Sequence, residues 1–266
     1  MRPLITAIDL DHTDWLGPDR ETIAREKAGI MRTARPVVCS DADIPTAIYH
    51  EADRLKCELY CLGRDFSYQR QPDYWLWTNS RGEQHKLPYP AQSGEHQLRN
   101  AAGVMMVLEC LAEALPVNYQ AVQQALSSMH VTGRQQILAG KTDWIFDVAH
   151  NAQSAGVLAD LLAGRTCQGA THAIVGMLKD KDIAAVLHPM LTHVTHWHCV
   201  DLAVPRGAEA RQIQSVLGSL SVTSEIACYR CVSDAMQQVQ GLVGEGDQVV
   251  VFGSFYTVAE ALQRGV

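Results

Sequence analysis

The sequence of 266 residues lacks several features that would assign it to particular classes of protein. No apolar run approaches the roughly 20 residues of a membrane-spanning helix, and the first residues, MRPLITAIDL, lack the apolar core and cleavage site of a signal peptide. The chain has no long basic run and a formal net charge of −7. We therefore expect neither a membrane nor duplex nucleic acid as a partner.

Cysteine motifs are also scarce, although the chain has eight cysteines. Most of them lie in apolar segments, where a free cysteine behaves as a small hydrophobic residue. Cys228 and Cys231 form a single CxxC motif without a second pair, so a zinc ribbon is poorly supported. This usage predicts a reducing, cytoplasmic environment.

The first half of the chain reads as a mixed α/β unit at residues 1–132. Proline and aspartate before residue 20 and glycine at 29 predict a short helix between them. Alternating aromatics around NSRG predict antiparallel hairpin strands within 66–88. The other expected strands are at 4–10, 36–40 and 58–63, and the other expected helices at 44–56, 95–114 and 118–129.

The second half changes its rhythm and reads as a complete doubly wound domain at residues 138–266. Short apolar strands alternate with amphipathic helices, which predicts a parallel sheet covered on both faces. The expected strands are at 144–149, 172–177, 194–200, 225–230 and 248–253, and the last helix is expected at about 255–263.

His12 is the first candidate site residue, because it follows the carboxyl end of a strand, where open α/β sheets place ligands. Histidine is a common metal ligand, and magnesium takes few protein ligands beside phosphates and waters. The alternative is a polar loop whose aspartates cap turns. The residues alone leave both open.

Lys27 is the second candidate, since it shares a helical face with Ile23 and Ile30. An inward lysine has a depressed pKa, and its neutral amine reacts with carbon dioxide to give a metal-binding carbamate. The alternative is a lysine whose stem lies along the surface at a helix C-terminus.

Three further candidates lie at the start of, or within, the second unit. Asp147, His150 and Asn151 occur where a strand gives way to a helix, a position suited to ribose contacts or to helix capping. Arg134, at the boundary between the units, is suited to clamping a phosphate, although a surface arginine is commoner. Ser254 is equally suited to binding a carboxylate at a helix N-terminus or to capping that helix.

One histidine-rich stretch is a poor metal site. His193, His196, His198 and Cys199 are close in sequence, but on a strand Cys199 faces away from His196 and His198.

Seven runs together resemble the folylpolyglutamate synthase and dihydrofolate synthase family of the Mur ligase superfamily. They occur in the family's order and span nearly the whole chain. The runs are LDHTDWLG, IAREKAGI, GEHQLRNAA, GRQQI, FDVAHN, VGMLKDKD and GSFYTVAEAL. The chain departs from the family at Ala152, where proline is usual.

The resemblance implies an ATP- and Mg²⁺-dependent ligase that joins L-glutamate to dihydropteroate or a folate through an acyl phosphate, acting as a monomer. Its fold would be the tail of a P-loop-type central domain followed by a Rossmann-like C-terminal domain. The implied metal-site residues are His12 and a carbamylated Lys27, the latter also catalytic. The implied nucleotide contacts are Asn100, Arg134 and Asp147, and the implied glutamate-site residues are His150, also catalytic, and Ser254.

The complete P-loop pattern, Gly-x4-Gly-Lys-Ser/Thr, does not occur in the sequence. In the family it lies far upstream of the LDHT run, so the chain is expected to be a C-terminal fragment that is inactive alone. Two other functions stay open: a nucleotide-binding module without catalysis, and a metal-dependent phosphohydrolase built on His12.

Overall fold

The computed structural model describes residues 2–10, 16–92 and 94–265. The chain forms two compact units, Met1–Met129 and His130–Val266. The second unit therefore begins a few residues before the expected boundary, and Arg134 belongs to it.

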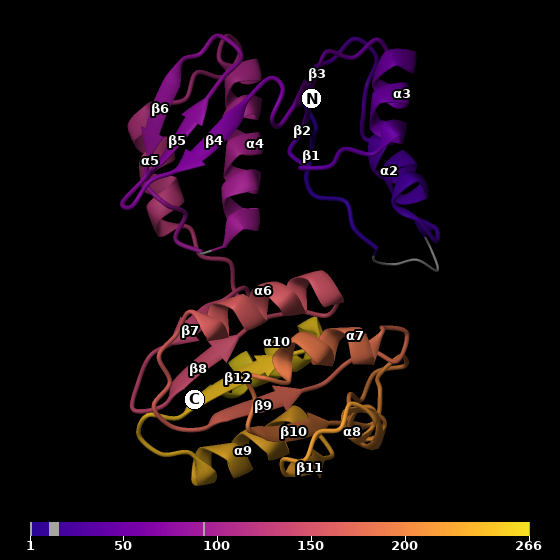
Figure 1. Cartoon of the computed structure of the whole chain (residues 1–266), viewed down its shortest axis with the longest axis vertical. Helices are drawn as coiled ribbons and strands as arrows, with labels where there is room; N and C mark the ends of the chain where they lie inside the picture. Colours follow the sequence, from indigo (N-terminus) through magenta and orange to yellow (C-terminus); the bar gives the residue numbers. More distant parts are fainter. Residues whose placement is uncertain (1, 11–15, 93, 266) are drawn as a thin grey trace. The chain divides into compact units, whose positions relative to one another are not determined.

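Unit 1 contains a three-stranded parallel sheet in the order β1-β2-β3 (Figure 1). The strands are short, and the helices α2 and α3 pack beside them. Their bounds are β1 Leu4–Ile5, α2 Arg20–Ala28, β2 Val37–Cys39, α3 Thr46–Arg54 and β3 Leu59–Cys61. Helix α2 begins after the N-cap Asp19 and ends at Gly29, as the sequence predicts.

The rest of unit 1 is an antiparallel sheet backed by two helices. The expected hairpins are confirmed as β4-β5-β6, whose tryptophans Trp75 and Trp77 are buried against α4. The bounds are β4 Ser67–Arg70, β5 Trp75–Thr78, β6 Gln84–Leu87, α4 Glu95–Leu111 and α5 Tyr119–Ser128.

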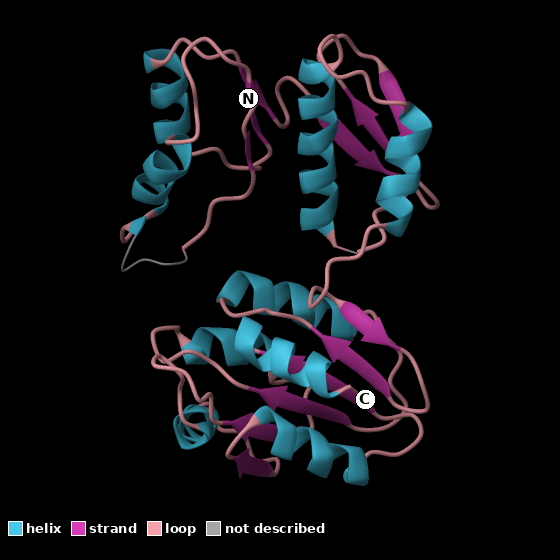
Figure 2. Ribbon diagram, turned by 180° about the vertical axis from the view of Figure 1, so that it is seen from behind, coloured by secondary structure: helices cyan, strands magenta, loops and turns pink. Residues whose placement is uncertain are grey.

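Unit 2 is a six-stranded sheet in the order β11-β10-β9-β12-β8-β7, parallel except for β7 (Figure 2). Apolar residues cover both faces. Helices α6, α7 and α8 pack on one face and α9 and α10 on the other. The expected doubly wound architecture is confirmed.

The elements of unit 2 follow in chain order. The strands are β7 Gln136–Leu138, β8 Asp143–Phe146, β9 Thr171–Val175, β10 His196–Val200, β11 Ile226–Tyr229 and β12 Gln248–Phe252. The helices are α6 Ala152–Ala163, α7 Ile183–Leu187, α8 Ala210–Ser219, α9 Val232–Leu242 and α10 Phe255–Arg264, with a 3-10 turn at His188–Met190.

Two details differ from the sequence-based expectation. The first strand is shorter than expected, because the amide of Ile8 donates to the Asp41 side chain (2.7 Å) rather than to a neighbouring strand. Strand β7 was not expected at all. Gly140, Lys141 and Thr142, the last three residues of a P-loop pattern, lie in the turn between antiparallel β7 and β8, not before a helix.

Candidate functional site

The carboxyl ends of β8, β12 and β9 meet at one edge of the unit 2 sheet, since β12 pairs with both other strands. The loops that follow them are tied together. The amide of Gly253 donates to the carbonyl of Ala149 (2.9 Å). Gly253 has φ +107°, and a Cβ there would lie 2.6 Å from the carbonyl oxygen of Gly176. Glycine is therefore required for this close approach.

Asp147 is buried beneath this edge, with 6% of its surface exposed. Its carboxylate accepts backbone hydrogen bonds from Gln135 (2.9 Å) and Ala149 (2.8 Å). Burial raises the pKa of Asp147, while these bonds and the nearby Arg134 and His150 oppose the rise. Asp147 thus fixes two loops in addition to any contact it makes with a ligand.

Arg134 is exposed and is carried by the turn that Asp147 holds. The amide of Arg134 donates to Val131 (3.0 Å), and Gln135 next to it adopts φ +44°. A non-glycine residue in this left-handed region is strained, so the bond from Gln135 to Asp147 compensates for that strain. The expected phosphate-binding arginine is therefore presented by a constrained turn.

His150 lies at the same edge as Arg134 and Asp147. Its Nδ1 is 2.8 Å from the carbonyl oxygen of Val148, which fixes the ring and makes Nδ1 the donor. The adjacent Asn151 caps α6 by accepting from the amide of Ser154 (2.8 Å). Of the two roles considered for Asn151, the structure shows the cap.

Ser254 is buried, with 3% exposed, and its hydroxyl serves helix α10. It accepts from the amide of Thr257 (3.1 Å) and lies 2.7 Å from the Thr257 hydroxyl. The Thr257 hydroxyl donates to the carbonyl of Gly176 (2.7 Å), so Ser254 is the donor in the hydroxyl pair. The structure thus favours capping over carboxylate binding for this side chain.

Phe255 was missed from the sequence. It is 58% exposed at the start of α10. The Arg134 guanidinium lies 5.7 Å from its ring centroid, and the His150 ring lies 5.9 Å from it. The available signal in the sequence was an aromatic residue directly after Gly253-Ser254 at the end of an expected strand.

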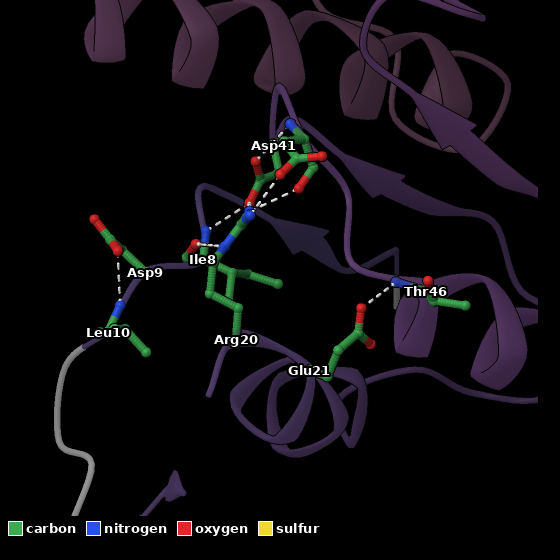
Figure 3. Close-up of polar contacts among 8 residues, drawn as sticks. Ile8, Asp9, Leu10, Arg20, Glu21, Asp41 and Thr46 are labelled. Carbon is green, nitrogen blue, oxygen red and sulfur yellow. Dashed lines mark hydrogen bonds and ion pairs between the residues drawn. The ribbon is translucent and has the colours of Figure 1, made fainter. Parts of the chain in front are cut away.

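The opening stretch of unit 1 is organised around Arg20 and the buried Asp41 (Figure 3). Arg20 donates to the carbonyl of Ile8 (2.9 Å), to the Asp41 carboxylate (3.3 Å) and to the Asp43 carboxylate (2.6 Å). Asp41 also accepts from the amides of Ile8 (2.7 Å) and Asp43 (2.9 Å). This network holds the chain that leads toward residue 11.

His12 lies outside the described residues. Lys27 is exposed, so the expectation that it points inward is wrong. The reason is that α2 ends before Ile30, which is 43% exposed and shares no helical face with Lys27. The buried face of α2 consists of Ile23, Ala24 and Ala28.

Asn100 is half-buried on α4 and lines an apolar groove of about 360 Å³ between α4 and α5. Other lining residues are Val104, Leu108, Val122 and Leu126. Asn100 supplies a polar group in these mainly apolar surroundings.

The histidines of β9 and β10 form a ladder rather than a chelating site. Nδ1 of His172 lies 3.1 Å from Nε2 of His198, whose Nδ1 lies 3.1 Å from the Tyr229 hydroxyl. The His196 ring stacks on His172 at 4.5 Å. Burial and the neighbouring histidines lower the pKa of His198 to about 4. Cys199 packs in the core on the opposite face.

Within the described parts of the chain, no three histidine, cysteine or acidic side chains are grouped so that they could hold a metal ion. Over the same ranges, no helix is long and apolar enough to cross a membrane.

Residues 133–255 match the model of the Mur ligase glutamate ligase domain. The dihydrofolate synthase/folylpolyglutamate synthase of Escherichia coli is 35% identical over 260 residues, which cover 98% of this chain and 59% of that relative. This chain thus spans about three fifths of the relative's length.

Solved structures give the same result. The structure of E. coli FolC in complex with DHPP and ADP is similar with a TM-score of 0.88 and 34% identity, covering 98% of this chain and 60% of that one. A bifunctional folylpolyglutamate synthase/dihydrofolate synthase with Mn, AMPPNP and L-glutamate bound has a TM-score of 0.86 and 37% identity, covering 98% and 61%.

Proposed function

The chain belongs to the dihydrofolate synthase/folylpolyglutamate synthase family of the Mur ligase superfamily, and from this premise we propose that it contributes to an ATP-dependent ligase that adds L-glutamate to dihydropteroate or a folate. The observation that carries the proposal is the grouping of Arg134, Asp147 and His150 at one sheet edge, within the segment that matches the glutamate ligase domain.

The proposed reaction has two steps. ATP transfers its γ-phosphoryl group to the carboxylate of the pteroate or folate and leaves as ADP, so the resulting acyl phosphate carries phosphate as a good leaving group. The glutamate amine then attacks the acyl phosphate, and the amide forms with release of phosphate. Positioning and charge stabilisation provide most of the acceleration in such phosphoryl and acyl transfers.

In this scheme Arg134 contacts a phosphate through its charged, forked guanidinium. Asp147 orients the Arg134 turn and accepts hydrogen bonds from the nucleotide, and Asn100 contacts ATP. His150 and the backbone near Ser254 lie on the glutamate side. We further propose a monomeric, cytoplasmic protein.

Magnesium and a carbamylated Lys27 belong to the proposal through family resemblance alone. Among the described residues no three histidine, cysteine or acidic side chains are grouped to hold a metal ion, and Lys27 is exposed on α2. We therefore assign the ion no step here, and we propose from the resemblance alone that His12 would be one of its ligands.

The test is calorimetric titration of the chain with ADP, beside Arg134→Ala and the control Arg206→Ala. Arg206 is also exposed and pairs with Asp180 at 3.3 Å. We expect Arg134→Ala to weaken ADP binding about tenfold, as a charge-assisted phosphate contact predicts, and Arg206→Ala to leave it unchanged. Absence of ADP binding, or equal affinity in both variants, would overturn the nucleotide assignment.

A nucleotide-binding module without catalysis is the second candidate. It is favoured because Arg134 and Asp147, the two expected nucleotide contacts at this sheet edge, both belong to unit 2. Formation of ADP from ATP that depends on dihydropteroate or folate together with L-glutamate distinguishes the ligase from the non-catalytic module. ADP binding without such turnover in this chain and in a longer protein that includes it would favour the module.

A further inference from the structure

The exposed ring of Phe255 sits among polar groups at the carboxyl edge of the unit 2 sheet. More than half of its surface is exposed, although it is the first residue of α10 and follows the buried Ser254. Exposure of a large apolar ring to water is unfavourable by about 25 cal/mol per Å² of apolar surface, so a ligand that covers it gains binding energy.

Two side chains from separate loops hold this ring. Arg134 belongs to the turn before β7, and its guanidinium carbon lies over the Phe255 ring, 5.7 Å from the ring centroid. His150 belongs to the loop after β8, and its ring centroid lies 5.9 Å from that of Phe255, with the two ring planes inclined by 49°. Both loops are fixed by the buried Asp147. The ring therefore sits in a defined setting of one cation and one oriented imidazole.

This combination suits one class of ligand. An aromatic side chain stacks on planar rings, and a neighbouring guanidinium binds a carboxylate or phosphate. The imidazole of His150 donates from Nδ1 to the carbonyl of Val148, so its neutral form carries its lone pair on Nε2.

We propose that Phe255 is a stacking contact for the planar ring of a ligand that also carries an anionic group, and that Arg134 receives the anion. The proposal deepens the proposed function and rests on it for the location of the ligand. Two molecules of that reaction have this chemistry: the adenine nucleotide, and the p-aminobenzoyl-glutamate portion of a folate.

The experiment titrates the full chain with ADP and, separately, with p-aminobenzoyl-L-glutamate, followed by amide chemical shifts in NMR spectra. The variants are Phe255→Ala, Phe255→Tyr and Tyr256→Ala. Tyr256 is the matched control, because it is the next residue of α10 and is 51% exposed. Since Phe255 and Tyr256 are both exposed, all three variants are expected to fold, and unchanged spectra away from α10 verify this.

Stacking on a base is worth about 1–3 kcal/mol, so we expect Phe255→Ala to weaken one probe about tenfold. Phe255→Tyr keeps the ring and should stay within about twofold of the parent affinity, as should Tyr256→Ala. Loss of ADP binding identifies the adenine as the stacked ring, and loss of p-aminobenzoyl-L-glutamate binding identifies the folate ring.

Parent affinity for both probes in Phe255→Ala overturns the proposal, and so does equal weakening in Tyr256→Ala. If Arg134→Ala weakens ADP binding while Phe255→Ala keeps parent affinity for both probes, the stacking contact is wrong and the proposed function stands. If the parent chain binds neither probe, both the stacking contact and the nucleotide assignment fail.

Discussion

In each unit a buried aspartate follows a parallel strand: Asp41 lies after β2 in unit 1, and Asp147 lies after β8 in unit 2. The surroundings stabilise these two carboxylates differently. Asp41 is 4% exposed and Asp147 is 6% exposed. Both accept from two backbone amides. Asp41 also pairs with the guanidinium of Arg20 at 3.3 Å.

The comparison separates two uses of one chemical group. The Asp41 network holds the backbone at Ile8, and its cation, Arg20, is hydrogen-bonded to Ile8, Asp41 and Asp43 within unit 1. At Asp147 two backbone amides hold the carboxylate, the nearby Arg134 adds a charge interaction, and the exposed Arg134 guanidinium lies 5.7 Å from the centroid of the Phe255 ring. The edge in unit 2 therefore carries an exposed guanidinium, whereas Arg20 donates to three residues of unit 1.

The largest effect is expected for Asp41→Ala. It leaves two backbone donors and part of the Arg20 guanidinium without their acceptor, so the free energy of unfolding should fall by about 4 kcal/mol. Urea unfolding measures this. The control is Asp43→Ala, whose side chain is 88% exposed although it also pairs with Arg20, and it should change stability by less than about 1 kcal/mol. Equal effects would show that Asp41 is no anchor.

The histidine ladder extends the comparison to a buried cluster of neutral groups. The pKa of His198 is lowered from 6.5 to about 4, so the folded state binds a proton there less readily than the unfolded state does. The contribution of His198 to the free energy of unfolding is therefore complete above pH 6.5 and is lost as the pH falls toward 4. The pKa of His172 is also lowered, by burial and His196, against the charge of Asp247. We expect a loss on the order of 3 kcal/mol over this window, since one pKa unit corresponds to about 1.4 kcal/mol.

Urea unfolding at a series of pH values measures this loss. His198→Phe should flatten the profile, whereas the exposed control His188→Gln should leave it unchanged. An unaltered profile in His198→Phe would remove His198 as the cause.

Asp147→Asn tests the second edge. The amide nitrogen cannot accept, so one of the Gln135 and Ala149 donors loses its partner, and stability should fall by about 2 kcal/mol. Burial raises the pKa of Asp147, so wild-type stability from this group is highest at low pH and decreases as the pH rises through the raised value. Because asparagine does not titrate, this pH dependence should be absent from the free energy of unfolding of the variant measured from pH 4 to 8. A variant of wild-type stability would contradict the anchoring role.

Ser254→Ala distinguishes capping from ligand binding at the same edge. It removes the N-cap of α10 and one of the two partners of the buried Thr257 hydroxyl, so the expected loss is about 1 kcal/mol. Ser254→Thr keeps the hydroxyl and serves as the control. If Ser254→Ala keeps full stability but loses affinity for L-glutamate, the carboxylate-binding role is correct and the cap is secondary.

The sequence predicts regular elements well where local signals are strong. Asp19 and Gly29 delimit α2, and alternating apolar runs identify the parallel strands of unit 2. Asp147 and His150 were expected at a strand end and lie there, because the carboxyl ends of parallel strands share an edge. Their partners were not predictable, because the bond from Gln135 to Asp147 depends on a left-handed turn that periodicity does not encode.

Two errors have the same origin. The inward face assigned to Lys27 used Ile30, which lies beyond the end of α2, and the length of the first strand was set by apolar residues rather than by available partners. In both cases apolar spacing was extended past the point where the backbone hydrogen bonds stop. Phe255 was missed because apolar character suggests a core residue, although this ring is exposed.

The smallest effect is expected for Lys27→Ala. Because Lys27 is exposed near the end of α2, its removal should change the free energy of unfolding by less than about 0.5 kcal/mol. The control is Ile23→Ala, one turn earlier on the same helix and 2% exposed, which should cost about 3 kcal/mol. A loss above about 2 kcal/mol for Lys27→Ala in urea unfolding would show that the side chain packs inward after all. With the expected neutral result, a loss of ligase activity caused by Lys27→Ala in a longer protein that includes this chain would reflect chemistry at the lysine, because folding would be excluded as its cause.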